Sequence, residues 1–285
     1  MIPQEFNYSR PKTLQDATDL LAATDAKVLA GGMSLIPLMK LRLATPEHLV
    51  DLCTVSDLNY ITEKSGAIHI GALTTHHQVE TSDLLNAKCS LLAETASHIG
   101  DSQVRNMGTL GGSTAHADPA ADYPAALCAL EAKVRVVRKG SERLLPINEF
   151  FIDSLTTALE PEEIISEIVL PVEKPGNTCA YRKLRQPASG FAIVGVAVRI
   201  RMTEGKIDMV RIGVTGLASK AFRANNVEEL LYGSCGSPKD IDNASALVDE
   251  GIQANTDLHA SSNYRRHMAR IYTARALTAA LERTT

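Results

Sequence analysis

Tryptophan is absent from the 285-residue sequence, and aromatic residues of all kinds make up only 4% of it. Proteins that bind single-stranded nucleic acid stack the bases on aromatic side chains, so the composition argues against that class. The formal net charge of −4 argues equally against a general binder of polyanions. Any anion that this chain binds must therefore be held locally, by backbone N–H groups and a few side chains.

Clustered cysteines are also missing. Iron–sulfur and zinc sites need several thiolates that converge, usually with close spacing between some of them. The sequence has no CxxC pair, and its five cysteines are far apart: Cys53, Cys89, Cys128, Cys179 and Cys235. We predict isolated reduced thiols, and neither a metal site nor an iron–sulfur cluster on this chain.

No hydrophobic run approaches the roughly 20 residues that span a bilayer. The first residues, "MIPQEFNYSRPKTLQD", lack the charged-then-apolar order of a secretory signal. We therefore expect a cytoplasmic protein without a membrane span.

The length and the hydrophobic content of 45% are sufficient for two or three compact units of mixed α+β structure. Residues 1–55 resemble a small α/β unit, in which Thr13 caps a first helix and Ser34 caps a second. Residues 56–172 form an α+β block with a long irregular loop after Gly100. The Pro/Gly-rich stretch "PVEKPGN" (171–177) is the clearest boundary, and residues 177–285 supply three strand candidates and then helices. The elements predicted from periodicity are strands at 26–30, 48–52, 67–73, 134–137, 162–171, 178–186, 191–202 and 206–217, and helices at 13–24, 35–43, 90–100, 122–130, 226–232, 238–254 and 263–284.

Gly31 and Gly32 stand between the strand at 26–30 and the following helix. At such a junction glycine lets the backbone turn sharply and lets a ligand approach closely, while unpaired N–H groups favour a phosphate. The segment is neither a Walker loop nor a GxGxxG fingerprint. A tight turn followed by an N-cap is the simpler alternative.

A second segment, "GTLGGSTAHADPAAD" (108–122), is rich in small and hydroxyl-bearing residues. Long irregular loops inside compact domains are usually functional, although an exposed connector is the alternative. Two separate glycine segments would suit a long, two-ended ligand such as a dinucleotide.

Three stretches carry a family resemblance: "AGGMSLIPLMKLRL" (30–43), "VRNMGTLGGSTAHADPAAD" (104–122) and "AYRKLRQPASGFAIV" (180–194). In this order they closely resemble the FAD-binding medium subunit of molybdenum hydroxylases, the family that includes carbon monoxide dehydrogenase and xanthine dehydrogenase. The resemblance implies a FAD-binding fold of the vanillyl-alcohol-oxidase type in two subdomains, 1–55 and 56–172. It also implies a C-terminal α+β domain, 177–285, with a three-stranded antiparallel sheet and helices.

The same resemblance implies which residues contact FAD. Leu29 to Leu35 would line the pyrophosphate, Asp122 would bind the sugar-like portion, and Ile165 and Lys183 would lie near the ring. Arg182 and Arg185 compete with Lys183 for its place in the alignment. The full implied set is Leu29, Ala30, Gly31, Gly32, Met33, Ser34, Leu35, Ile99, Thr109, Gly111, Gly112, Ser113, His116, Asp122, Ile165 and Lys183.

Two departures from the family pattern stand out. Met33 replaces a polar residue that is common in relatives, and "PASGF" (187–191) lacks a carboxylate that many relatives have.

The resemblance further implies partners. A large subunit would carry the molybdenum cofactor and a small subunit two [2Fe–2S] clusters, in a dimer of heterotrimers. FAD would collect electrons from the clusters and pass them to an external acceptor, and no side chain of this chain would be catalytic. Two other functions stay open: a self-contained flavin-dependent NAD(P)H reductase on the same fold, and a non-catalytic nucleotide-binding assembly module.

Simpler interpretations compete at three further places. Adjacent His76 and His77 could indicate a metal site, but on a strand they would point to opposite faces. His98, His116, Asp118 and Asp122 could surround zinc, although a flavin segment explains most of them. The basic terminal helix is expected to pack by an apolar face and expose its arginines, and Tyr181 to Lys183 could be an edge-strand surface.

Overall fold

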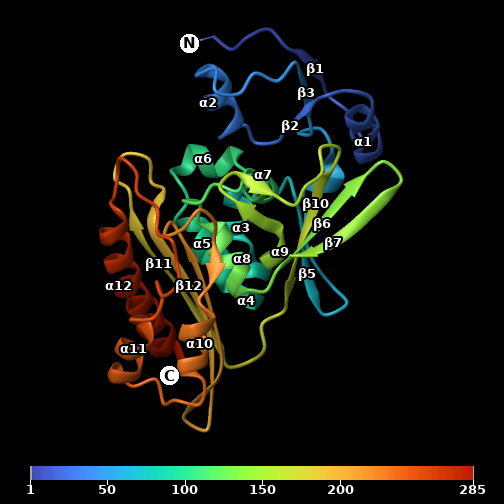
Figure 1. The fold of residues 1–285 in the computed structure, drawn as a ribbon. Coiled ribbons are helices and arrows are strands. Elements are labelled where there is room, and N and C mark those ends of the chain that lie inside the picture. Colours follow the sequence, from blue (N-terminus) through green and yellow to red (C-terminus); the bar gives the residue numbers. More distant parts are fainter. Residues whose placement is uncertain (1, 285) are drawn as a thin grey trace.

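A computed structural model of the chain describes residues 2–284. Four sheets, one of them a two-stranded hairpin, and twelve α-helices organise these residues into a small N-terminal unit, a central unit and a C-terminal domain (Figure 1). Helices α3 to α8 lie between the central sheet and the C-terminal sheet. The alternation of helices and strands confirms the predicted mixed fold.

The N-terminal unit is a parallel sheet of three short strands in the order β1 (Asn7–Ser9), β3 (His48–Asp51), β2 (Lys27–Leu29). Helix α1 (Leu14–Ala23) begins as predicted, because the Thr13 hydroxyl accepts a hydrogen bond from the Asp16 N–H at 3.1 Å. Helix α2 (Leu35–Lys40) follows Ser34, but the Ser34 side chain makes no capping hydrogen bond. The N-terminal unit has its own small hydrophobic cluster, which includes Ala17, Leu21 and Val50.

The central unit contains an antiparallel sheet in the order β4 (Ile61–Lys64), β5 (Ala67–Gly71), β10 (Ile164–Pro171), β6 (Lys133–Arg138), β7 (Ser141–Pro146). A short helix α9 (Ile147–Phe150), the hairpin β8 (Phe151–Asp153) and β9 (Thr156–Thr157), and the 3-10 helix η1 (Ser56–Leu58) complete its periphery. The covering helices are α3 (His76–Thr81), α4 (Asp83–Lys88), α5 (Ser90–Ser97), α6 (Ser102–Met107), α7 (Leu110–His116) and α8 (Tyr123–Ala129).

The prediction of a long irregular loop after Gly100 is wrong, since α6 and α7 occupy much of this segment. Each helix has an effective N-cap: Asp101 accepts from the Val104 N–H at 2.8 Å, and Thr109 accepts from the Gly112 N–H at 3.1 Å. Two glycines inside α7 weaken its intrinsic helix propensity. Tertiary contacts compensate for this low helix propensity, because the backbone of Gly111 packs directly on Ala72.

The expected strand at His76 and His77 is also wrong. Thr75 and Gln78 form a capping box, in which each side chain bonds the other residue's backbone N–H, and this starts helix α3. His76 is therefore buried against the central unit while His77 faces outward.

The C-terminal domain has an antiparallel sheet in the order β11 (Asn177–Arg185), β12 (Ala192–Thr203), β13 (Lys206–Thr215), β14 (Phe222–Arg223). A tight turn joins β12 to β13, with positive φ angles at Glu204 and Gly205. The sheet has four strands rather than the predicted three. The prediction missed β14 because this strand is only two residues long and carries no periodic signal. Helices α10 (Asn225–Leu231), α11 (Pro238–Ser245) and α12 (Ser262–Leu281), followed by the 3-10 helix η2 (Glu282–Thr284), complete the domain. Helix α11 ends nine residues before the expected 254.

Helix α12 packs on this sheet through Ala269, Ala276 and Leu277 (Figure 1). The expected solvated basic face is only partly present. Arg265 is 4% exposed and donates to the carbonyl oxygens of Ile193 and Gly216 at 2.6 and 2.7 Å. Its neighbours Arg266 and Arg270 both pair with Asp249.

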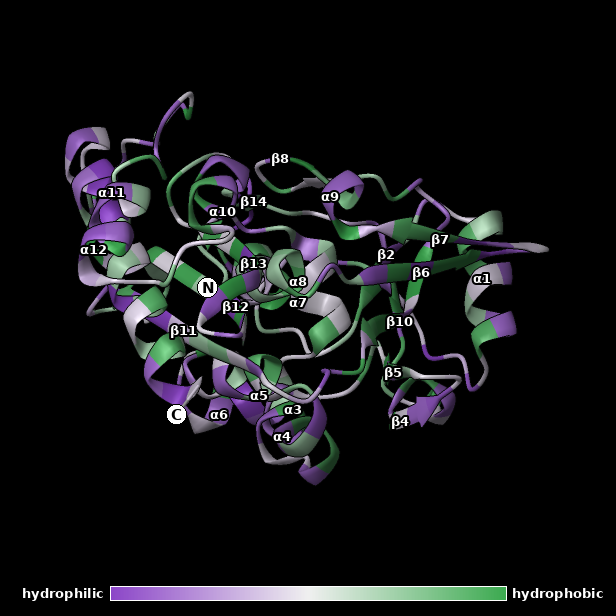
Figure 2. Ribbon diagram, turned by 90° about the horizontal axis from the view of Figure 1, so that it is seen from below, coloured by the Kyte–Doolittle hydropathy of each residue, from purple (hydrophilic) through white to green (hydrophobic). Residues whose placement is uncertain are grey.

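Hydrophobic residues gather on the strands of the two larger sheets, whereas α11 and α12 are largely hydrophilic (Figure 2). Helix α8 joins the central unit to the C-terminal sheet: a Cβ on Gly213 of β13 would lie 1.9 Å from the Ala125 carbonyl oxygen. Within residues 2–284, no helix combines the length and the apolar character needed to cross a membrane.

Candidate functional site

The two glycine segments meet in space. A Cβ on Gly31 would lie 2.0 Å from the Met107 carbonyl oxygen and 2.8 Å from the Gly108 Cα, so only glycine fits there. A Cβ on Gly112 would come within 3.7 Å of the Ala30 side chain. Segments about 80 residues apart in sequence therefore lie against each other, as a shared binding site requires.

The first segment has free backbone donors. Within residues 2–284, no backbone or side-chain acceptor pairs with the N–H groups of Gly31, Gly32, Met33 or Ser34. Gly32 adopts a φ of +73°, which turns the chain between these groups. Successive N–H groups in such a turn form a concave anion site, and the uncommitted Ser34 hydroxyl adds a donor beside them. This arrangement fits a pyrophosphate.

The second segment has few free donors. The N–H groups of Leu110 and Gly111 donate to the carbonyl oxygens of Thr74 and Ala72, both at 2.9 Å, and that of Gly112 donates to Thr109. Gly111 is buried, whereas Gly112 and Ser113 are partly exposed beside Ala30. The second segment thus offers close-packed backbone surface and the Ser113 hydroxyl rather than a row of amides.

Asp122 and Lys183, which the sequence placed near different parts of FAD, form an ion pair. The Lys183 ammonium lies 2.8 Å from the Asp122 carboxylate, and the Tyr181 hydroxyl donates to the same carboxylate at 2.6 Å. The side chains of Asp122 and Lys183 are 5% and 1% exposed. Burial raises the pKa of Asp122 and lowers the pKa of Lys183, while each charge opposes the shift in the other. Tyr181 and Lys183 are therefore not an edge-strand surface, but join the C-terminal domain to the central unit.

Ile99 lies in a turn that the same cluster holds. Lys183 donates to the His98 carbonyl oxygen at 3.0 Å, and the His98 ring contacts the Tyr181 ring edge-on at 5.4 Å. Arg105 donates to the Ile99 carbonyl oxygen at 3.0 Å. The turn at Ile99 is thus fixed from both sides.

Two implied residues lie apart from this surface. Ile165 is 5% exposed in β10, paired with Val136, and belongs to the central hydrophobic core. His116 ends α7, and burial lowers its pKa. The structure brings Gly31, Gly32, Gly112 and Ser34 together. Ile165 does not contact them directly, because its strand β10 packs beneath α7. Within residues 2–284, no three metal-ligating side chains gather, so the alternative of zinc near His116 gains no support.

Sequence reasoning missed the support beneath the second segment. A Cβ on Gly108 would lie 2.5 Å from His76 Nε2, and the His76 ring packs edge-on against Tyr123 at 5.2 Å. Burial lowers the pKa of His76 to about 4, with a smaller contribution from the Arg105 charge, so the ring is neutral at pH 7. The T-x-x-Q capping box was the signal that could have placed His76 on a helix.

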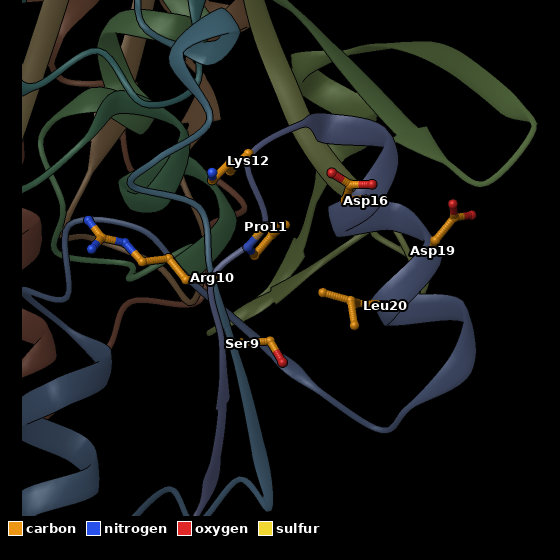
Figure 3. Close-up of a pocket in the computed structure, with 7 residues that line it drawn as sticks. All are labelled: Ser9, Arg10, Pro11, Lys12, Asp16, Asp19 and Leu20. Carbon is orange, nitrogen blue, oxygen red and sulfur yellow. The ribbon is translucent and has the colours of Figure 1, made fainter.

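A groove of about 590 Å³ lies elsewhere on the N-terminal unit. Residues 9–12 form one side, and Asp16, Asp19 and Leu20 of α1 form the other (Figure 3). No residue of either glycine segment lines it. A smaller pocket of about 260 Å³ is lined by Asp118 and Ala120 of the second segment and by Gln186 and Phe191 of the β11–β12 connection.

Comparison with known proteins agrees with this geometry. The family model "FAD binding domain in molybdopterin dehydrogenase" matches residues 4–173, and the model "CO dehydrogenase flavoprotein C-terminal domain" matches residues 179–280. The carbon monoxide dehydrogenase medium chain of Afipia carboxidovorans is 38% identical over 97% of both chains.

Further relatives match over almost the whole chain. The 6-hydroxypseudooxynicotine dehydrogenase complex subunit alpha of Paenarthrobacter nicotinovorans is 36% identical, covering 99% of this chain and 97% of the relative. The solved carbon monoxide dehydrogenase of Hydrogenophaga pseudoflava superposes with a TM-score of 0.97 at 38% identity, covering 99% of both chains. The chain belongs to the family of FAD-binding medium subunits of the molybdenum hydroxylases.

Proposed function

We propose that this chain is the FAD-carrying electron-transfer subunit of a multi-subunit molybdenum hydroxylase. The observation that carries the proposal is the row of free N–H groups at Gly31–Ser34, set against the backbone of a second glycine segment. These N–H groups are partly exposed and converge on a sharp turn, and a cradle of this kind is suited to an anionic ligand. The family match supplies the identity of that ligand as FAD.

Bound FAD would supply two-electron acceptance and one-electron transfer. The amides of Gly31 to Ser34 would bind the pyrophosphate, with Leu29, Ala30 and Leu35 beside them. Thr109, Gly111, Gly112 and Ser113 would line the cofactor from the second segment, with His116 at its far end. Ile99 and Lys183 would lie toward the ring, and Ile165 would support that side from the core. Asp122 would keep Lys183 charged and oriented while it accepts from the sugar-like portion of the cofactor.

The proposal includes partners that resemble those in the relatives' complexes. Electrons would arrive from two [2Fe–2S] clusters in a small subunit, after oxidation of the substrate at the molybdenum cofactor of a large subunit. They would leave to an external acceptor. The complex would be a cytoplasmic dimer of heterotrimers, and the units 1–55, 56–172 and 177–285 would be the two FAD subdomains and the C-terminal domain.

Co-expression with the proposed small and large subunits and spectroscopy of the purified complex test this function. We expect one FAD per chain, released by denaturation and identified by chromatography, together with molybdenum and iron in the complex. The isolated chain loaded with FAD should not turn over NAD(P)H without partners. Steady NAD(P)H oxidation by that chain would favour the self-contained reductase, and a chain that never takes up FAD would favour the assembly module.

A further inference from the structure

Helix α6 forms one wall of the candidate site without any hydrophobic anchorage of its own. None of its residues, Ser102–Met107, is buried. Yet its last carbonyl group, that of Met107, contacts the backbone of Gly31. Because no apolar side chain of this helix is fully buried, polar contacts contribute strongly to its position.

Arg105 makes the contacts that link α6 to its surroundings. Its Nε donates to the Glu80 carboxylate of α3 at 2.8 Å, and its Nη1 donates to the Ile99 carbonyl oxygen at 3.0 Å. The guanidinium therefore connects three parts of the site region: α3, the turn at Ile99 and α6. Planar guanidinium groups are suited to such a fixed fork, whereas an ammonium group acts as a single point charge.

A second connection ends at the same place. The His76 N–H donates to the Gly108 carbonyl oxygen at 2.9 Å, immediately after the carbonyl of Met107 that contacts Gly31. Helix α3 thus holds the C-terminal end of α6 through the backbone and its middle through Arg105. The His76 contact involves main-chain atoms, so Arg105 is the side chain that a substitution can remove.

We propose that Arg105 is a positioning residue for FAD. It fixes the Met107 carbonyl against Gly31 and, at the same time, the carbonyl of Ile99, so that both walls keep the spacing that the cofactor needs. This inference rests on the proposed flavin site. Arg105 and Glu80 are 20% and 25% exposed, and a pair this exposed contributes little to global stability. Its effect should therefore appear in cofactor retention rather than in folding.

The test compares matched arginine variants in the complete complex. Arg105→Met keeps the length of the side chain and removes its hydrogen bonds. Arg201→Met is the control, because Arg201 pairs with Asp208 at 2.9 and 3.0 Å, with 27% and 32% exposure, on the β12–β13 hairpin away from both segments. FAD dissociation is followed by the rise of flavin fluorescence after dilution, and the Tm of each FAD-free chain is measured separately.

We expect Arg105→Met to release FAD about tenfold faster than the wild type, the usual scale for losing a residue that orients direct contacts. Arg201→Met should release FAD at the wild-type rate. The FAD-free chains of both variants should melt within a few degrees of each other. Arg105→Lys should release FAD at a rate between those of the wild type and Arg105→Met, because one ammonium group cannot satisfy Glu80 and Ile99 with the same geometry.

Two results would overturn the inference: wild-type release of FAD from Arg105→Met, or equal acceleration of release in Arg201→Met. If Arg105→Met melts far below the wild type or does not fold, Glu80→Gln carries the same comparison, since it weakens only the contact between Arg105 and α3, and wild-type release from Glu80→Gln would then overturn the inference. A wild-type complex that contains no FAD would refute the proposed function instead, so the two failures are distinguishable.

Discussion

Gly31 and Gly32 are glycines for two different reasons. At Gly31 the limit is space, because the Met107 carbonyl occupies the place where a Cβ would be. At Gly32 the limit is the backbone, whose φ of +73° strains any L side chain. The sequence suggested close approach of a ligand as the common reason. Only the structure shows that the first of these glycines serves the contact between the two segments.

Replacing Gly31 by alanine should separate the two segments and abolish tight FAD binding. The added Cβ would sit 2.0 Å from a main-chain oxygen that cannot rotate away, so the backbone must shift. We expect the FAD content of the purified complex to fall below about one tenth of the wild-type value, a loss of more than about 1.4 kcal/mol in binding. The FAD content is measured by extracting the flavin from the purified complex and quantifying it.

Gly66→Ala is the control for that substitution. Gly66, unlike Gly31, has a positive φ of +75° and faces open space, so alanine there adds backbone strain without touching the site. Full FAD content in Gly31→Ala would contradict the contact. Equal loss in both variants would show that the effect is general destabilisation.

Asp122 and Lys183 should behave as one unit. Removing one charge leaves the other buried without its partner, which typically costs about 3–5 kcal/mol. We therefore expect Asp122→Asn and Lys183→Met each to lower the free energy of unfolding strongly, and the double variant to be much less destabilised than the sum of the two. Urea unfolding of the FAD-free chains gives this coupling energy.

The same variants separate stability from cofactor binding. FAD affinity that remains low in the stable double variant would indicate that Asp122, Lys183 or both contribute directly to cofactor binding. Strict additivity of the two single effects would contradict the buried pair.

At the level of elements, periodicity predicted the parts of the fold whose burial alternates regularly. Strands β10 to β13 and helices α1, α5 and α8 lie close to their expected positions. Elements defined by caps and tertiary contacts were missed. Helices α6 and α7 contain small and polar residues that read as a loop, and β14 forms only because β13 offers it an edge.

The central sheet contains a charged cluster on strands β5, β10 and β6. Glu167 of β10 is 7% exposed and accepts from Tyr60 at 2.6 Å, Arg135 at 2.7 Å and His69 at 3.1 Å. Burial alone would raise the pKa of Glu167, but these three donors outweigh it and the pKa is lowered. The ionised carboxylate therefore ties the three strands together.

This cluster predicts a pH-dependent contribution to stability. Because the pKa of Glu167 is lower in the folded chain than the usual value of about 4.3, its contribution is present above that value and is lost as the pH falls through the folded pKa. Glu167→Gln should lower the free energy of unfolding by about 1–3 kcal/mol at pH 7 and by progressively less below about pH 4. Unfolding curves over this range measure the difference.

Glu142→Gln is the matched comparison, since Glu142 pairs with the same Arg135 but is 62% exposed. It should change stability little at any of these pH values. A Glu167→Gln deficit that does not depend on pH would contradict the assigned ionisation.

On the scale of the whole molecule, the candidate site joins two units and the third supports it. Gly31 of the N-terminal unit lies against the end of α6 in the central unit, and Lys183 of the C-terminal domain bonds Asp122 and the His98 carbonyl oxygen of the central unit. The sequence predicted these segments individually, and the family resemblance grouped them. Neither the sequence nor the resemblance could reveal that the amides of the second segment already donate to protein carbonyl groups. Nor could they reveal that Asp122 and Lys183 bond each other, because both facts depend on long-range packing.

FAD should therefore act as a link between units. A ligand present at one hundred times its Kd stabilises the folded state by about 2.7 kcal/mol. We expect removal of FAD to accelerate hydrogen exchange at residues 30–36 and 98–113 while residues 196–212 of the C-terminal sheet stay protected. Mass spectrometry of the exchanged peptides provides the measurement. Uniform acceleration along the chain would contradict a local role.

The seam between Gly31 and Met107 is made of main-chain atoms on both sides. Its width is consequently independent of the chemistry of most neighbouring side chains, which can vary without altering it. A single residue inserted into either segment, by contrast, would shift one wall against the other. Engineering of this subunit should therefore tolerate exchanges at the residues around this contact, Gly31 itself excepted, far better than changes in segment length.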